Sequence, residues 1–201
     1  MERFKTLTAV AAPIDMASVD TDKILPARFL RKTRGPEYGR YLFHDIRFDA
    51  EGRERPEFVL NQPAYRDAKI LVAGANFGVG SSREGAVYTL WDNGIRSVIA
   101  PSFGDIHYGN QLQNGMLPVI LSEDACAKLR AQLHEKPGAR ITVDLEQQVV
   151  TGPDGATYPF DIDPGHKERL LKGLDDIGLV LQHIERIEGF ELAYGKQYPW
   201  I

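Results

Sequence analysis

The segment 69–85, KILVAGANFGVGSSREG, passes from an apolar run through glycines to two serines, an arginine and a glutamate. Residues 70–73 are continuously apolar and partly β-branched, which is typical of a strand buried on both faces. Gly78 and Gly80 follow this strand, and a backbone without Cβ atoms can turn tightly there and approach a ligand closely. We therefore predict a buried strand, a ligand-binding loop and then a helix.

Two serines and an arginine stand at the predicted start of this helix. Ser81 or Ser82 can cap it, and Asn93-Gly94 supplies the left-handed residue that ends it. A helix N-terminus favours an anion because its unpaired N–H groups point outward and its dipole is positive there. Arg83 adds a planar cation that matches a carboxylate or a phosphate. Glycines and serines alone also make ordinary turns, but this order of residues after a buried strand favours an anion site.

Two well-known glycine motifs do not fit this loop. A P-loop ends in Gly-Lys-Ser or Gly-Lys-Thr, whereas Gly80 is followed by two serines and no lysine. The nucleophile elbow of hydrolases reads Gly-x-Ser-x-Gly, whereas the glycine after Ser82 comes one position too late, at Gly85.

The composition predicts a soluble globular protein without a nucleic-acid or membrane role. The chain has 201 residues, 43% of them hydrophobic and 26% charged, which is enough for one substantial core. Its net charge is -4, so binding of nucleic acid has little electrostatic support. No apolar stretch has the length of a membrane span and the N-terminus lacks a signal-peptide core, so we expect a cytoplasmic protein.

Metal ligands are scarce in the sequence. The one cysteine, Cys126, lies in a helical pattern and cannot by itself hold an iron-sulfur cluster, which needs three or four thiolates. Asp20 and Asp22 stand close together but have no histidine or glutamate at ligand spacing, so we expect them to cap a turn or hold a basic side chain. We predict no metal site in this chain, and we assign no role to its lone histidines, among them His107 near the predicted loop.

The remaining pattern alternates strands and helices, which favours parallel strand pairing with right-handed crossovers. The segment at about 28–61 has prolines, glycines and aromatic residues with little periodicity, and we expect a long, partly packed functional loop. The chain 1–201 is expected to form a single domain with a helical C-terminal segment and a polar, aromatic tail. The predicted strands are 4–12, which Pro13 ends, 97–100 and 117–121; the predicted helices are 101–114, 122–134, 164–174 and 175–187; and 141–150 is predicted to pair with 157–162 as a hairpin.

Motifs in order along nearly the whole chain resemble the small subunit of 3-isopropylmalate dehydratase, a swivelling-domain relative of aconitase. The Gly-Ser-Ser-Arg-Glu segment alone indicates only the wider aconitase superfamily, and the ordered agreement is what is specific. The resemblance implies an α/β fold of the aconitase swivelling type, in three layers β/β/α with a partly parallel central sheet. The matching motifs are DTDKI at 20–24, the loop 28–34, VLNQP at 59–63, NFG at 76–78, GSSRE at 80–84, IAPSF at 99–103, NG at 114–115, LPV at 117–119 and LLKGLDDIGLVL at 170–181.

The resemblance also implies an activity and a partner. Members of this family interconvert 2-isopropylmalate and 3-isopropylmalate in leucine biosynthesis by losing water and adding it back. A separate large subunit is expected to carry a [4Fe-4S] cluster, one iron of which acts as a Lewis acid. The present chain is then expected to bind no cofactor itself, to join the large subunit in a heterodimer or an assembly of heterodimers, and to act on a small branched malate.

Roles for individual residues follow from the same resemblance. Ser81 matches the catalytic serine of the superfamily, which acts as a base in its alkoxide form on a carbon-bound proton next to a carboxylate. Ser82 is expected to hydrogen-bond the substrate, and Arg83 to bind one of its carboxylates.

The basic loop 28–34 is the second predicted part of the site. In the family, the loop after the Asp-Thr-Asp motif faces the variable group of the substrate and the large subunit. Phe29 and Leu30 are therefore expected to accept the isopropyl group, and Arg31 to meet a carboxylate. From the residues alone, a solvated mobile loop is the alternative.

Two positions depart from the family pattern. The family usually has cysteine between the two glycines and histidine after Arg-Glu, and Val79 and Gly85 occupy these positions here. A glycine in a first helical turn costs roughly 1 kcal/mol relative to alanine, so we expect a close neighbour at Gly85 or a local reshaping. The departures leave the substrate open: methylmalate or dimethylmalate is an alternative, as are a non-catalytic anion-binding module and a small enzyme that acts without a partner.

Overall fold

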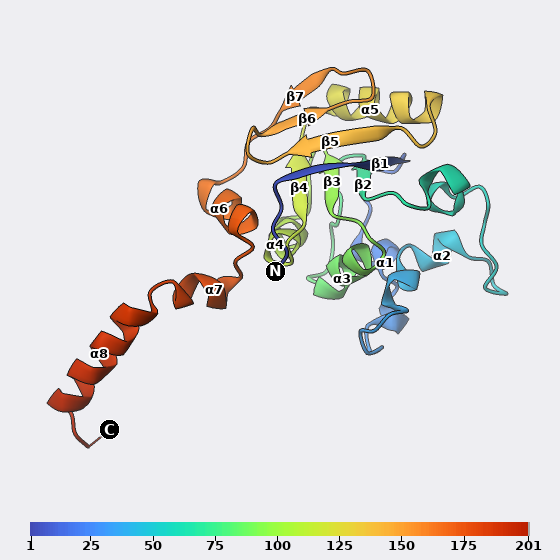
Figure 1. Cartoon of the computed structure of the whole chain (residues 1–201). Helices are drawn as coiled ribbons and strands as arrows, with labels where there is room; N and C mark the ends of the chain where they lie inside the picture. The colour runs from blue at the N-terminus through green and yellow to red at the C-terminus, as the bar shows by residue number, and fades with distance from the viewer. Residues whose placement is uncertain (201) are drawn as a thin grey trace.

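The computed structural model describes residues 1–200, which form seven strands, eight α-helices and several short 3-10 helices (Figure 1). The strands are β1 (Thr6–Ile14), β2 (Ile70–Ala73), β3 (Ser97–Ala100), β4 (Leu117–Ile120), β5 (Arg140–Asp144), β6 (Val149–Thr151) and β7 (Thr157–Pro159). The α-helices are α1 (Thr21–Ile24), α2 (His44–Arg47), α3 (Glu84–Asp92), α4 (Asp105–Gln113), α5 (Glu123–Glu135), α6 (Pro164–Lys172), α7 (Asp176–Leu181) and α8 (Ile184–Gln197).

All seven strands belong to one sheet in the order β4-β3-β2-β1-β5-β6-β7. Strands β1 to β4 are parallel, and β5, β6 and β7 continue the sheet beyond β1 as antiparallel strands. The long strand β1 serves both parts, because residues 6–10 pair with β5 and residues 11–14 pair with β2. The predicted α/β fold with a partly parallel central sheet is confirmed.

Successive residues of the parallel strands face two different cores. Leu71 and Ala73 face a core that includes α1, α3 and residues of the segment 38–68. Ile70 and Val72 face a second core that they share with β5, β6, α5 and α6. All four side chains are fully buried. The parallel strands therefore form a middle layer between helices on one side and the antiparallel strands with α5 on the other.

Strand β1 continues past Pro13, where we predicted its end. The reason is the change of partner within the strand, since β5 pairs no further than Val10 and residues 11–14 pair only with β2. The N–H of Ala11 donates to the carbonyl of Ala139, on the β5 side. Pro13 lies two residues further and faces the same side, where no strand follows, so its missing N–H costs no ladder hydrogen bond.

Turns within the periodic pattern shift other boundaries. Residues 141–150, predicted as one strand, divide into β5 and β6 at a turn in which Gln148 has a φ of 55°. Strands β5 to β7 are thus a three-stranded meander, of which only β6 and β7 form the predicted hairpin. The predicted helix 175–187 divides into α7 and α8, and α8 extends into the predicted tail as far as Gln197.

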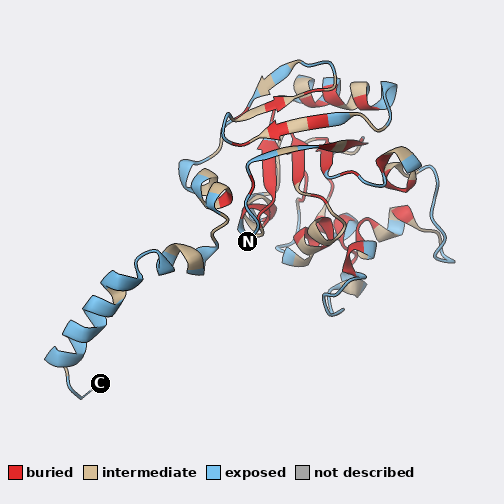
Figure 2. Ribbon diagram, in the orientation of Figure 1, coloured by how far each residue is buried: buried red, intermediate tan, exposed pale blue. Residues whose placement is uncertain are grey.

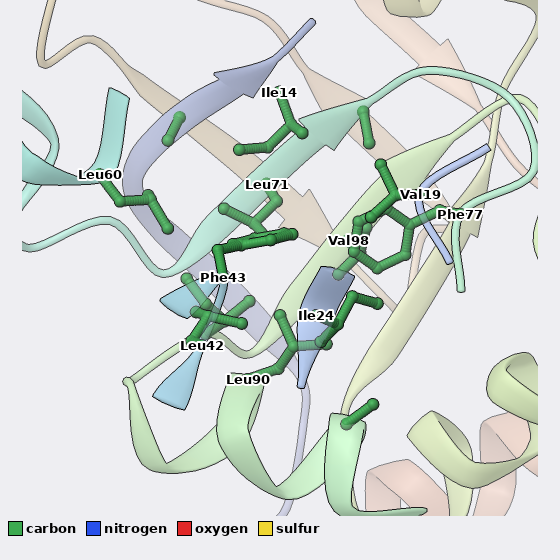
Figure 3. Packing of buried hydrophobic residues seen from close by; sticks show 14 of the residues in the cluster. Ile14, Val19, Ile24, Leu42, Phe43, Leu60, Leu71, Phe77, Leu90 and Val98 are labelled. Atoms are coloured by element: carbon green, nitrogen blue, oxygen red, sulfur yellow. The ribbon is translucent and has the colours of Figure 1, made fainter. Parts of the chain in front are cut away.

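Part of the long segment 28–61 packs into the first core, as its aromatic residues suggested, whereas residues 30–37 and 50–57 are exposed. Leu42 and Phe43 have no exposed surface. Figure 3 shows Phe43 beneath Leu71 of β2, and Leu42 beside Leu90 of α3. This part of the chain therefore fills the space between the parallel strands and the helices α1 and α3.

The C-terminal helices α7 and α8 project away from the rest of the molecule (Figure 1). Figure 2 shows them exposed along most of their length, whereas α6 still buries Leu170. Within residues 1–200, no helix combines the length and the apolar character needed to cross a membrane.

Candidate active site

The loop between β2 and α3 carries the predicted site residues, and the segment that leads into α1 holds it from one side. The N–H of Gly78 donates to the carbonyl of Val19 at 2.7 Å. The N–H of Thr21 donates to the carbonyl of Val79 at 2.9 Å, and its Oγ1 donates to the carbonyl of Ser81 at 3.2 Å. These three hydrogen bonds fix the loop backbone as far as the first serine.

Asp20 and Asp22, in the segment that holds the loop, have the two roles that the sequence predicted: one caps a turn and the other holds a basic side chain. Asp20 caps α1, because its Oδ1 accepts a hydrogen bond from the N–H of Lys23 at 2.7 Å. The carboxylate of Asp22 forms an ion pair with the guanidinium of Arg83, whose side chain is only 18% exposed. Arg83 is thus held in one orientation next to the serines, with its charge partly shielded from water.

A second segment, between β3 and α4, supports the loop from the other side. The N–H of Asn76 donates to Ser102 Oγ at 2.9 Å, and the N–H of Phe77 donates to the carbonyl of Ser102 at 3.0 Å. His107, in the first turn of α4, is buried directly behind Gly78. Burial lowers the pKa of its imidazole to about 4, so His107 is uncharged at neutral pH and serves as a packing group.

Both loop glycines are required by the backbone. Gly78 and Gly80 have φ angles of 74° and 101°, in the region that disfavours side chains. At Gly78, a Cβ atom would also lie 2.7 Å from the Cβ of His107 and closer still to its ring. The close approach of α4 to the loop therefore depends on this glycine.

Ser81 and Ser82 precede α3 and do not cap it, so this part of the prediction is wrong. The helix begins at Glu84, with Arg83 as N-cap residue and no side-chain hydrogen bond at the cap. The physical reason is a further tight turn, since the N–H of Arg83 donates to the carbonyl of Ser81 at 2.8 Å. Because α3 begins only after the two serines, both are exposed at the surface, near the positive end of this helix.

The basic loop 28–34 is fixed at both ends by ion pairs. Arg28 binds the carboxylate of Asp45 at its start. At its end, Arg34 donates two hydrogen bonds to Asp92 of α3, at 2.8 and 2.7 Å. The loop is thus anchored to α2 and α3 at its ends, and all of its residues except Phe29 are exposed.

The three residues predicted to contact substrate from this loop lie differently. Leu30 is 42% exposed and lies next to the first turn of α3, where a Cβ atom at Gly85 would be 3.7 Å from its Cδ2. Phe29 instead stacks on Tyr41, with ring centroids 4.2 Å apart. Arg31 is exposed and forms no ion pair with any residue in the described range 1–200. Leu30 therefore lies beside the first turn of α3, while the ring of Phe29 packs on Tyr41. The roles of all three residues stay predictions.

The close neighbour expected at Gly85 is present. A Cβ atom there would lie 2.9 Å from Leu25 Cδ2 and 3.1 Å from Tyr38 Oη. Both neighbours are buried, so neither can move aside freely. Glycine at this position allows α1 and the 28–61 segment to pack against the first turn of α3.

We expect Gly85→Ala to lower stability, although alanine is the better helix former. The gain in helix propensity is about 1 kcal/mol, whereas forcing a methyl group against buried neighbours costs about 1–3 kcal/mol. The matched control is Gly109→Ala in α4, where no atom lies within 4 Å of the added Cβ. Denaturant midpoints should fall for Gly85→Ala and stay or rise for Gly109→Ala, and an equal rise in both would show that the first turn of α3 has room for a side chain.

Sequence reasoning did not assign a supporting role to Thr21, Tyr38 or His107. Thr21 was visible only as the middle of an Asp-Thr-Asp motif, and its two bonds to the loop depend on the fold. Tyr38 and His107 meet Gly85 and Gly78 across more than 25 residues of chain. Gly78 and Gly85 were the signal in the sequence for these contacts, because a glycine often marks a position where another segment packs closely against the backbone.

Comparison with known proteins first defines the class. The family model "Aconitase C-terminal domain" matches residues 1–124, and the model LeuD_N matches residues 127–164. The chain therefore belongs to the family of aconitase C-terminal domains.

Relatives that match this chain over its full length identify the family more closely. The chain is 51% identical to the 3-isopropylmalate dehydratase small subunit of Paramagnetospirillum magneticum, with 100% of both chains covered. It is also 51% identical to that of Rhodospirillum centenum, with 100% of this chain and 98% of the relative covered. A crystal structure of 3-isopropylmalate dehydratase from Methanocaldococcus jannaschii is similar with a TM-score of 0.66 and 26% identity, covering 92% of this chain and 99% of that one. The chain belongs to the family of 3-isopropylmalate dehydratase small subunits.

Proposed function

We propose that this chain supplies one part of the active site of a hydro-lyase that interconverts 2-isopropylmalate and 3-isopropylmalate in leucine biosynthesis. The observation that carries the proposal is the loop between β2 and α3, which is held by hydrogen bonds and presents Ser81, Ser82 and Arg83 next to one another. Both neighbouring segments fix the backbone of this loop, so its groups are held in place before a substrate arrives. Such preorganisation is what transition-state stabilisation requires.

Each site residue has a task in this reaction. Dehydration removes a proton from a carbon next to a carboxylate and the hydroxyl group from the neighbouring carbon, which leaves a double bond. Hydration then adds a hydroxyl group to the first carbon and a proton to the second. Ser81 would take the proton on its Oγ and give it back, which requires its alkoxide to be stabilised by nearby positive charge. The N-terminus of α3 and the Arg83 guanidinium provide positive charge near it. Ser82 would donate to the substrate, and Arg83 would bind a carboxylate with its planar fork.

This chain's own residues do not fit an iron-sulfur cluster. Its single cysteine, Cys126, is fully buried in the second core, and burial raises the pKa of the thiol to about 11. A cluster needs three or four thiolates. Within residues 1–200 no group of three or more histidine, cysteine, aspartate or glutamate side chains is arranged to hold a metal ion. We therefore assign the [4Fe-4S] cluster of the proposed enzyme to a separate large subunit.

The exposure of the serines supports such a partner. A proton transfer from carbon needs an environment from which water is excluded, because low polarity strengthens the electrostatic interactions there. Ser81 and Ser82 are exposed in this chain. A second protein surface that covers the loop would complete the site, and the large subunit is the partner that we propose for this position.

The test is anaerobic turnover of the two chains together. This chain and its cognate large subunit, with the cluster reconstituted, should form the unsaturated acid from 3-isopropylmalate only when both are present. Methylmalate and dimethylmalate are measured beside it, because Val79 and Gly85 depart from the family pattern. Turnover only on a smaller malate would change the substrate and keep the mechanism, whereas turnover on none would favour a non-catalytic anion-binding module.

We expect Arg83→Lys to raise KM for the malate substrate by about 10-fold to 100-fold, the equivalent of about 1.5–3 kcal/mol for hydrogen bonds to a charged group. Lysine keeps the charge but replaces the bidentate fork by a single ammonium group, and it also loosens the pairing with Asp22. Steady-state kinetics of the two-chain complex measure the effect. Arg66→Lys is the control, because Arg66 pairs with Glu54 at an exposed position outside the loop. Unchanged kinetics in Arg83→Lys would remove Arg83 from the site.

A further inference from the structure

The segment 175–200, called the C-terminal arm here, is folded but covers nothing in this chain. The arm contains α7 and α8, and none of its residues is buried. It follows Gly173, a left-handed residue that ends α6, and points away from the molecule (Figures 1 and 2). Helices of this length are marginal in water unless an apolar face is packed. The arm therefore has the properties of a segment whose apolar face packs against another molecule.

One side of α8 carries a row of large apolar side chains, together with Glu191, which lies between Ile187 and Tyr194 on the same side. The apolar members follow one another at spacings of three or four residues, which places them on one face of a helix. Phe190 is 65% exposed and stacks on Tyr194, with ring centroids 5.5 Å apart, and Tyr194 in turn contacts Tyr198 at 4.8 Å. An exposed row of this kind marks an interaction site. This apolar stripe consists of Ile184, Ile187, Phe190, Tyr194 and Tyr198.

The charges of the arm favour a protein over a lipid surface. Helices that lie on membranes carry lysine and arginine on their polar face. The arm has five acidic side chains and only two basic ones, at Arg186 and Lys196. Three of the acidic residues, Glu185, Glu188 and Glu191, belong to α8 itself. A groove that accepts the stripe should therefore be apolar and bordered by lysine or arginine.

A second copy of this chain is a poor occupant. α8 has 14 residues and is only ~21 Å long, so two such helices side by side offer little area compared with the ~1,200–2,000 Å² of stable interfaces. Two acidic arms would also repel one another. A groove on a larger protein can enclose the stripe more completely, as in the binding of amphipathic helices by their partners.

We infer that the C-terminal arm binds the large subunit, with the apolar stripe of α8 in a groove that has a basic border. The inference rests on the proposed function, which already requires a partner over the serine loop. In Figure 1 the arm and the helices α1 and α3, which frame that loop, all lie below the sheet. A partner that covers the loop and also holds the arm would extend over both, and the arm would add contact area outside the catalytic site.

The experiment compares two aspartate substitutions in the full-length chain. Phe190→Asp puts a charge into the stripe, whereas Leu192→Asp is the matched control, because Leu192 is equally exposed at 68% but lies ~200° further around the helix. Binding to the large subunit, measured by sedimentation or surface binding, should weaken at least about 30-fold for Phe190→Asp, as for a buried aromatic hot spot. Leu192→Asp should bind within about threefold of the unchanged chain. Thermal unfolding of each isolated chain should be unaltered, since neither residue packs against the body.

The outcomes separate the arm from the proposed function. At a saturating concentration of the Phe190→Asp chain, kcat should return to its normal value, because the Ser81 loop is intact. If the unchanged chain binds and turns over substrate while Phe190→Asp binds equally well, the inference is wrong and the proposed function stands. If the unchanged chain binds the large subunit but no malate is converted, the proposed function fails while the two variants still test the arm. If Phe190→Asp instead dissolves a dimer of this chain, or abolishes binding to vesicles of anionic lipid, the arm has a different occupant and the inference is overturned.

Discussion

Ser81→Ala is expected to lower kcat of the reconstituted two-chain enzyme by about 10²–10⁴-fold, the contribution of a well-placed general base. KM should change little, since Ser82 and Arg83 would still bind the substrate. The backbone of the loop should keep its shape, because the bonds from Thr21 go to carbonyl groups and not to the serine side chain. Removing one exposed hydroxyl leaves no buried polar group without a partner, so stability and assembly with the large subunit should be unchanged.

Ser82→Ala is the matched control for this prediction. It removes the same hydroxyl group from the next residue, which is equally exposed on the same loop. If Ser82 only hydrogen-bonds the substrate, its loss should raise KM by about 10-fold, the equivalent of about 1.5 kcal/mol, and affect kcat much less. A Ser81→Ala complex that retains kcat within about threefold would exclude Ser81 as the base. Equal kinetic losses in the two variants would show that the serines bind the substrate together and that the base is elsewhere.

The parallel half of the fold was predictable because its signals are local. The apolar runs of β2, β3 and β4 are short and contain β-branched residues, which is typical of strands in a buried parallel sheet. Asn93-Gly94 ends α3 as predicted, with a φ of 101° at the glycine. The predicted helix 122–134 is also present, and Ser122 caps it, since its hydroxyl accepts a hydrogen bond from the N–H of Ala125. Each of these features is determined by residues close to one another in the chain.

The errors arise where a distant segment determines the local structure. Pro13 stays within β1 because β5 ends its pairing before it, which no local pattern reveals. The serines fail to cap α3 because Thr21, 60 residues away, holds the carbonyl of Ser81 in a turn. The substrate contact of Phe29 stays a prediction, and the stacking of its ring on Tyr41 is a further contact that no local pattern reveals. The types of residue at the site could be predicted from the sequence, whereas their orientation depends on contacts between remote segments.

Gly78→Ala is expected to destabilise the chain by about 3 kcal/mol or more and to displace the serine loop. Two independent costs add up at this position. A side chain at a φ of 74° costs about 1–2 kcal/mol, and the new Cβ would overlap the side chain of His107, which is buried and cannot withdraw. Because Gly78 bonds to Val19 on one side and packs on α4 on the other, any shift moves the loop that carries Ser81. The midpoint of chemical denaturation and kcat of the complex should therefore fall together.

Two further variants separate the costs at Gly78. Gly52→Ala introduces the same strain, at a φ of 78°, but no atom lies within 4 Å of its Cβ, so its loss measures the backbone term alone. The double substitution Gly78→Ala with His107→Ala removes the overlap and should recover part of the stability that Gly78→Ala loses, relative to the sum of the single losses. If Gly78→Ala lowers the free energy of unfolding by no more than Gly52→Ala does, the contact with His107 does not constrain the loop. A large excess loss with partial recovery would establish that α4 holds the serine loop in place through a glycine and a neutral, buried histidine.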